Sequence, residues 1–143
     1  MNIQIRILTS GEEGVLEQVA PGVFDMPVNS ALVSEFLRDP RHHIAVAIEA
    51  RTVVGFASAV HYVHPDKPTQ MWINEVGVAP THRRRSLGRN LVRTLLDRAR
   101  SLECHEAWVA TDRSNEAAMR LYASIEESIP PAESVVFEFK LQS

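Results

Sequence analysis

One stretch of the chain, from Val76 to Leu91, constrains the fold more than any other. An apolar strand ends at Pro80, a short basic turn follows, and the next residues, which include Ser86 and Gly88, begin a helix. Small residues let the main chain approach an anion, and the free N–H groups in the first turn of a helix point toward it. This order of elements predicts a cradle for the phosphates of a ligand.

Charge is distributed unevenly along the chain, which carries a net charge of −3. Residues 70–102 carry 7 basic and 2 acidic side chains, whereas residues 1–69 and 103–143 are both acidic. The basic block coincides with the predicted cradle. The acidic remainder is either ordinary surface charge or the attraction for a cationic second substrate, and it argues against nucleic acid as a partner. The acidic candidates for such a role are Asp25, Glu35, Asp66, Glu126 and Glu127.

Length and composition indicate one ordinary globular domain over residues 1–143. The order of its predicted elements, given below, makes this an α/β domain. We expect no membrane segment, because no apolar run is long enough, and no signal peptide, because residues 1–8 alternate polar and apolar. Cys104 is the only cysteine, so neither an internal disulfide nor a cysteine-based metal site is expected. A cytoplasmic protein without a bound metal is the prediction.

Periodicity predicts the elements of this domain. Alternation or apolar runs predict strands at 3–8, 43–49, 52–62, 71–78, 107–110 and 134–141, and helical spacing predicts helices at 10–19, 30–38, 86–101 and 115–124. Three consecutive strands imply antiparallel pairing, and the strand–helix–strand unit after them implies one parallel pair. A dinucleotide fold is excluded because the chain has no G-x-G-x-x-G turn.

Two motifs about 30 residues apart carry a family resemblance. The run Arg83-Arg84-Arg85-Ser86-Leu87-Gly88, led in by Val78-Ala79-Pro80, resembles the Gln/Arg-x-x-Gly-x-Gly/Ala signature of the GNAT N-acetyltransferases. The run from Asn115 to Tyr122 is similar to the family's second landmark, an Asn that begins a helix with Leu-Tyr further on. The resemblance covers nearly the whole chain. Segments 36–39, 53–55 and 73–75 look most like the GNAT-type aminoglycoside 3-N-acetyltransferases.

The chain departs from the family pattern at two places. Ser86 stands where the signature has its first glycine, and its hydroxyl can itself bond a phosphate oxygen. After Tyr122 the family usually has Gly-Phe, whereas here Glu126 and Glu127 follow Ile125. The helix then lacks a glycine at its C-terminal end, so the path after Tyr122 is not predicted.

The resemblance implies acetyl-CoA as the acetyl donor and a single-domain, mostly antiparallel mixed sheet flanked by helices. It also implies a splay between the two central strands, 71–78 and 107–110, in which the pantetheine arm lies. The residues that this assignment places at acetyl-CoA are Val76, Gly77, Val78, Arg83, Arg84, Arg85, Ser86, Leu87, Gly88, Arg89 and Asn115. The alternative for Asn115 is a helix cap only.

Acetyl transfer to an amine needs a group that accepts a proton and a group that supplies one. Glu75 is the candidate base, because a carboxylate in an apolar strand is costly unless it faces a polar cavity. It can instead anchor a cationic substrate or bond a neighbouring group. Tyr122 stands at the position of the family's thiolate-protonating tyrosine, with a core aromatic as the alternative. His61 and His64 are weaker candidates for the base.

These residues predict an N-acetyltransferase that acts on a small, cationic primary amine such as an aminoglycoside or a polyamine. A protein or peptide N-acetyltransferase is the alternative within the same chemistry. A catalytically silent CoA-binding sensor is the alternative of another class, supported by Ser86 and the missing Gly-Phe. The family's habit also suggests a homodimer.

Overall fold

The computed structural model describes residues 2–83 and 86–142. Its elements, in chain order, are β1 (Gln4–Ile7), the short helix η1 (Glu13–Glu17), α1 (Ser30–Arg38), β2 (His42–Glu49), β3 (Thr52–Tyr62), β4 (Gln70–Val78), the short helix η2 (Pro80–His82), α2 (Leu87–Ser101), β5 (Glu106–Val109) and α3 (Glu116–Ala123). No helix among the described residues is long and apolar enough to cross a membrane.

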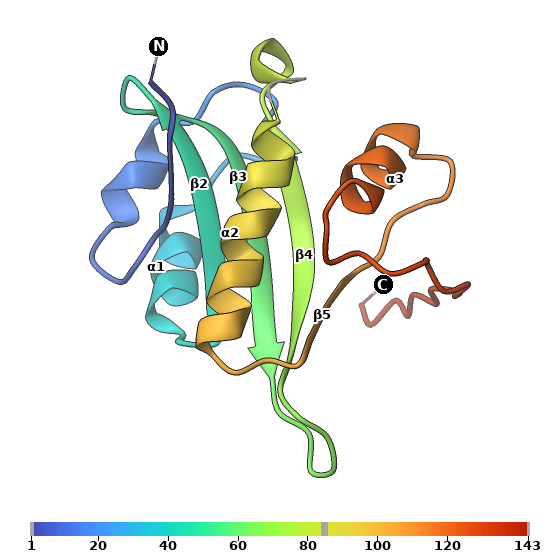
Figure 1. Ribbon diagram of the computed structural model, residues 1–143. Coiled ribbons are helices and arrows are strands. Elements are labelled where there is room, and N and C mark those ends of the chain that lie inside the picture. Colours follow the sequence, from blue (N-terminus) through green and yellow to red (C-terminus); the bar gives the residue numbers. More distant parts are fainter. Residues whose placement is uncertain (1, 84–85, 143) are drawn as a thin grey trace.

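The strands form one mixed sheet in the order β1-β2-β3-β4-β5 (Figure 1). The first three pairings are antiparallel and β4 pairs with β5 in parallel, as the sequence predicts. The turn between β2 and β3 holds Ala50 and Arg51, both with positive φ, which is the backbone geometry of a tight hairpin.

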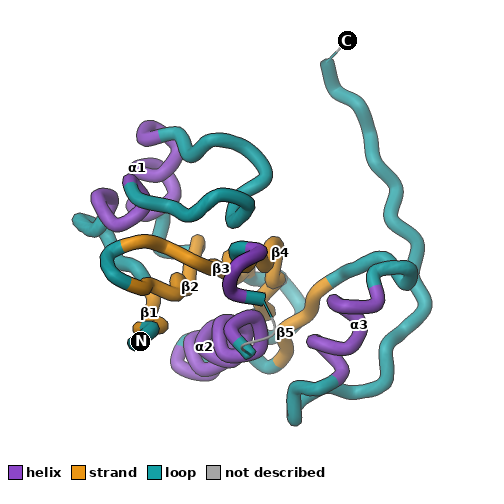
Figure 2. The backbone as a smooth tube through the Cα atoms, turned by 90° about the horizontal axis from the view of Figure 1, so that it is seen from above, coloured by secondary structure: helices purple, strands orange, loops and turns teal. Residues whose placement is uncertain are grey.

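Helices cover both faces of the sheet. Figure 2 shows α2 on one face and α1, with the loop that precedes it, on the other. The apolar side of α2 includes Leu91 and Leu95, both fully buried, and it packs on β2, β3 and β4. Helix α2 therefore anchors the sheet and presents its N-terminus at the end of β4.

Two of the sequence predictions about secondary structure are wrong. Segment 10–19 forms only a short 3-10 helix over Glu13–Glu17. Segment 134–141 forms no strand, although it alternates, because a strand needs a hydrogen-bonding partner and the segment lies apart from the sheet (Figures 1 and 2). Strand β5 is therefore the edge strand of the sheet, whereas the sequence predicts it to be one of the two central strands.

Candidate active site

Helix α2 begins where the sequence predicts the cradle. Ser86 takes the N-cap position with φ of 60°, a left-handed conformation, and its side chain makes no capping hydrogen bond. Leu87 and Gly88 follow in the first turn and are buried. The N–H groups of this turn have no partner within the helix. The main chain therefore presents donors to an anion at the place that the sequence predicts.

Two described arginines, Arg83 and Arg89, lie at this helix end. The Nε atom of Arg83 donates a hydrogen bond of 3.3 Å to the main-chain carbonyl of Val78, where β4 ends. The Nε atom of Arg89 is buried and has no hydrogen-bond partner among the residues that the structure describes. An unpaired buried donor beside a helix N-terminus fits an anionic ligand such as a phosphate. The predicted site residues Arg84 and Arg85 lie outside the described residues.

Hydrogen bonds among Glu49, Thr81 and His82, called the brace below, hold the turn before the cradle. His82 Nε2 lies 2.9 Å from Glu49 Oε1, and His82 Nδ1 lies 2.8 Å from the Thr81 hydroxyl. The His82 and Glu49 side chains are largely buried. Sequence reasoning missed this brace, because the two residues lie 33 positions apart and no local pattern marks them.

Strands β4 and β5 separate as they approach the cradle. Their register pairs Gln70 with Glu106 and ends at Ile73 with Val109, so the second half of β4 has no β5 partner. Val76, Gly77 and Val78 lie in this half and still pair with β3 on the other side. The splay that the family resemblance implies is therefore present, with main-chain groups open on one side of β4.

Glu75 lies in the same half of β4 and is exposed. It pairs with Ser58 of β3, and Gly77 pairs with Phe56. The side chains of Glu75, Ser58 and Phe56 therefore point to one face of the sheet, which is also the face where a side chain at position 77 would lie. The loop before α1 lies on this face. A Cβ atom on Gly77 would lie 2.3 Å from the carbonyl oxygen of Val23.

The other side of the splay is formed by α3. The side chain of Asn115 caps this helix by accepting a hydrogen bond of 3.1 Å from the N–H of Ala118. Leu121 packs against Gly88, because a Cβ atom added to Gly88 would lie only 2.5 Å from a methyl group of Leu121. Tyr122 is half-buried, and burial raises the pKa of its hydroxyl, which stays protonated at neutral pH.

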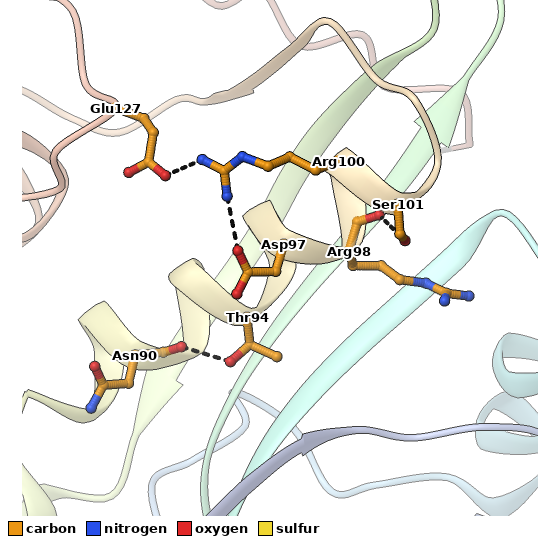
Figure 3. Close-up of polar contacts among 7 residues, drawn as sticks. All are labelled: Asn90, Thr94, Asp97, Arg98, Arg100, Ser101 and Glu127. Atoms are coloured by element: carbon orange, nitrogen blue, oxygen red, sulfur yellow. Dashed lines mark hydrogen bonds and ion pairs between the residues drawn. The ribbon is translucent and has the colours of Figure 1, made fainter.

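The two acids that replace Gly-Phe bind α2. Glu126 lies 3.1 Å from Arg93, and Glu127 pairs with Arg100, which also lies 2.8 Å from Asp97 (Figure 3). Arg100 holds the pKa of Glu127 below its usual value. Both acids are therefore engaged within the chain, which weakens the suggestion that they attract a cationic acceptor.

The histidine candidates are not placed beside Glu75. His61 Nδ1 lies 2.8 Å from Nε2 of the buried His43, and its β3 position alternates with Ser58 so that it points to the α2 face. His64 Nε2 lies 3.3 Å from Gln70 Oε1. Glu75 is therefore the candidate base that this face of the sheet supports.

An open depression lies beside the same loop. It has a volume of about 590 Å³ and is lined by η1, the start of α1 and the residues between them. Its lining includes three carboxylates, Glu13, Glu17 and Asp25, together with apolar groups such as Phe24 and Val33. Phe24 stacks on Phe56 of β3 with ring centroids 4.0 Å apart.

Comparison with known proteins shows which family the chain belongs to. The model of the acetyltransferase (GNAT) family matches residues 15–125. The chain therefore belongs to the GNAT acetyltransferase family, as its motifs indicate.

Three individual proteins illustrate the similarity. The chain is 31% identical over 103 residues to the N-alpha-acetyltransferase RimI of Mycobacterium tuberculosis H37Rv, covering 72% of this chain and 63% of that protein. It is also similar in fold to an aminoglycoside acetyltransferase, meta-AAC0020, from an uncultured soil metagenomic sample, solved with sisomicin. That match has a TM-score of 0.80 and 17% identity, and covers 98% of this chain and 97% of that one. A third relative is the aminoglycoside N-acetyltransferase AAC(6')-Iy in complex with CoA, with a TM-score of 0.71 and 22% identity over 98% and 95% of the two chains.

Proposed function

We propose that this protein is an N-acetyltransferase that moves the acetyl group of acetyl-CoA to a primary amine. The observation that carries the proposal is the arrangement around β4. On one side of β4 the strand loses its β5 partner, and this gap ends at the N-terminus of α2, where basic residues lie. The carboxylate of Glu75, on the same strand, points to the face of the sheet that the loop before α1 covers. The family match and the CoA complex of a structural relative support this assignment.

In this proposal the diphosphate of acetyl-CoA binds the N–H groups of Leu87, Gly88 and Arg89, with charge-assisted hydrogen bonds from Arg83 to Arg85 and from Arg89. The buried Nε atom of Arg89, which has no hydrogen-bond partner in the described part of the chain, supports the proposed contact of Arg89 with the diphosphate. The pantetheine arm takes the place of the missing β5 partner, on the main chain of Val76 to Val78. The amide of Asn115 has an N–H₂ group that its capping bond does not use, and this group is the proposed contact to the arm.

The reaction is a direct attack of the amine nitrogen on the thioester carbonyl carbon. An alkylammonium has a pKa near 10, so it must first lose a proton, and Glu75 accepts it directly or through water. A main-chain N–H of β4 stabilises the negative charge that develops on the carbonyl oxygen. When the C–S bond breaks, the sulfur becomes a thiolate, and the Tyr122 hydroxyl supplies its proton. The Tyr122 hydroxyl carries a proton at neutral pH, as this role requires.

The acceptor that we propose is a small amine with several positive charges, of the aminoglycoside or polyamine kind. The carboxylates Glu13, Glu17 and Asp25 around the open depression support a cationic acceptor. Structural relatives that act on aminoglycosides support it also. The second candidate is the N-terminal amine of a protein, favoured by the 31% identity to an N-alpha-acetyltransferase.

A thiol-release assay with acetyl-CoA tests the proposal across aminoglycosides, polyamines, amino acids and short peptides. Turnover with amino sugars or polyamines supports the first candidate, and turnover only with peptides supports the second. Binding of acetyl-CoA is measured separately as a rise in melting temperature. A rise without turnover of any acceptor would favour a CoA-binding sensor, and the absence of a rise would contradict the cofactor assignment.

We further propose that the protein forms a homodimer through its C-terminal segment. Val135, Phe137, Phe139 and Leu141 are all 78% exposed or more, at alternating positions, and the edge of β5 is free. An alternating apolar segment and an open sheet edge are complementary. The mass of the full chain, measured by light scattering, should be that of a dimer, and a Phe137→Glu/Phe139→Glu variant should be monomeric. A monomeric wild-type chain would refute this.

A further inference from the structure

The two tryptophans of the chain lie against each other on the surface of the sheet. Trp72 of β4 pairs in register with Trp108 of β5, and the ring centroids are 5.5 Å apart at an interplanar angle of 16°. Trp108 is 46% exposed. This position is one residue before the end of β4–β5 pairing, so the rings lie at the closed end of the splay.

The indole rings and Glu75 share one face of the sheet. On β3, Ser58, Val60 and Tyr62 alternate to one side, and their β4 partners are Glu75, Trp72 and Gln70. The register shifts between Ser58 and Ala59, which leaves one extra residue on β4 and keeps Trp72 and Glu75 on the same side. Without this bulge, residues three apart on a strand would point to opposite faces.

Hydrogen bonds hold Trp108 in place. Its indole N–H donates to the hydroxyl of Tyr62, and that hydroxyl donates to Gln70 Oε1 over 3.2 Å. His64 reaches the same Gln70 oxygen and lies edge-on to Tyr62. Exposed aromatic rings that are fixed in this way lose little conformational entropy when a ligand binds.

The chemistry around the rings suits a cation. The face of an indole carries negative potential and attracts ammonium groups. Glu106 pairs with Gln70 in the β4–β5 register, which places a carboxylate on the same face beside the rings, and Glu75 lies toward the other end. The residues from Trp72 to Glu75 span ~10 Å along β4.

We propose that Trp72 and Trp108 form a stacking subsite for the acceptor, which takes an amino-sugar ring with its protonated amine over the indoles. A second amine of the same molecule then reaches Glu75. This inference rests on the proposed acetyltransferase function and narrows its acceptor to a cationic molecule with at least two linked units. A peptide N-terminus has no need of such a ring subsite, so the subsite separates the two candidate acceptors.

Binding is testable without turnover, because these are the only two tryptophans in the chain. Titration with neamine, a two-ring amino sugar, should change the intrinsic tryptophan fluorescence in a saturable way. Trp72→Phe and Trp108→Phe each leave one reporter and should both show the change. A fluorescence signal that does not respond to neamine while neamine is acetylated would overturn the subsite.

Kinetics supply the second test. Trp108→Ala should raise the KM for neamine about 3- to 30-fold, as the loss of a cation–π contact predicts. Trp108→Phe, which keeps a flat ring, should recover most of that loss, and the KM for acetyl-CoA should not change in either variant. Trp108 is half-exposed on an edge strand, so both variants should fold, and their unfolding curves test this.

The failure of this inference differs from the failure of the proposed function. An unchanged neamine KM in Trp108→Ala refutes the subsite while acetyl transfer stands. If no amine is acetylated and acetyl-CoA causes no thermal shift, the proposed function fails. Saturable neamine fluorescence would then still support a binding site for amino sugars at the tryptophans, and a silent titration would refute it.

Discussion

The buried histidine pair beneath α2 predicts how the stability of the fold depends on pH. His43 is 3% exposed and its Nε2 lies 2.8 Å from Nδ1 of His61, so one ring donates to the other. Burial lowers the pKa of His43 to about 4, and the positive charges of His61, Arg98 and His42 act in the same direction, against Asp39. The pKa of His61 is also lowered, first by its burial and then by Arg41 and Arg98.

The sign of the effect follows from the lowered pKa. In the unfolded chain His43 takes up a proton near its ordinary pKa of 6.5, whereas in the folded chain it stays neutral until the pH reaches about 4. Below pH 6.5 the proton therefore favours the unfolded chain, and stability falls as the pH falls. The difference of about 2.5 pKa units corresponds to a loss of about 3 kcal/mol by pH 4, and about 2 kcal/mol by pH 5.

Urea unfolding at a series of pH values from 7.5 to 4 measures this loss. His43→Asn should be less stable than wild type at pH 7.5 but should lose about 3 kcal/mol less on acidification. His105→Asn, which changes an exposed histidine, should follow the wild-type curve. Parallel curves for wild type and His43→Asn, or a His43 pKa near 6.5 measured by NMR, would refute the reasoning.

Three further substitutions test the site. Ser86→Gly should stabilise the protein by about 1 kcal/mol, measured by urea unfolding. A non-glycine residue in the left-handed region costs ~1–2 kcal/mol, and the greater freedom of glycine in the unfolded chain offsets part of the gain. An unchanged or lower stability would contradict this. Gly77→Ala should cost about 1–3 kcal/mol, since its Cβ would lie 2.3 Å from the carbonyl oxygen of Val23, whereas Gly14→Ala, with no atom within 4 Å, serves as a control with little change. Tyr122→Phe should lower kcat about 10²- to 10⁴-fold while acetyl-CoA still raises the melting temperature, and unchanged turnover would remove Tyr122 from the mechanism.

The sequence predicts the strand, turn and helix from 71 to 101 almost to the residue, because apolar periodicity, Pro80 and Gly88 all agree there. The final strand fails because alternation describes a strand only when a partner edge is present, and no local pattern supplies that partner. The Trp72–Trp108 pair and the Glu49–His82 brace both join residues more than 30 positions apart. The tryptophan pair depends on the β4–β5 register, and the Glu49–His82 contact depends on how β2 meets the turn after β4. The sequence reveals neither arrangement.

The structure shows how the chain accommodates its two departures from the family signature. Ser86 adopts the left-handed conformation that glycine adopts most readily, so the turn keeps its path at an energetic cost. After α3, where the family has Gly-Phe, Glu127 forms an ion pair with Arg100 of α2. Leu121 of α3 packs on Gly88 of α2. Both contacts fix α3 against α2, and α3 carries Tyr122. The position of the proposed acid therefore depends on contacts to the same helix that forms the cradle. Replacing Arg100, which has no part in the proposed acetyl-CoA contacts, should reduce turnover more than it reduces acetyl-CoA binding.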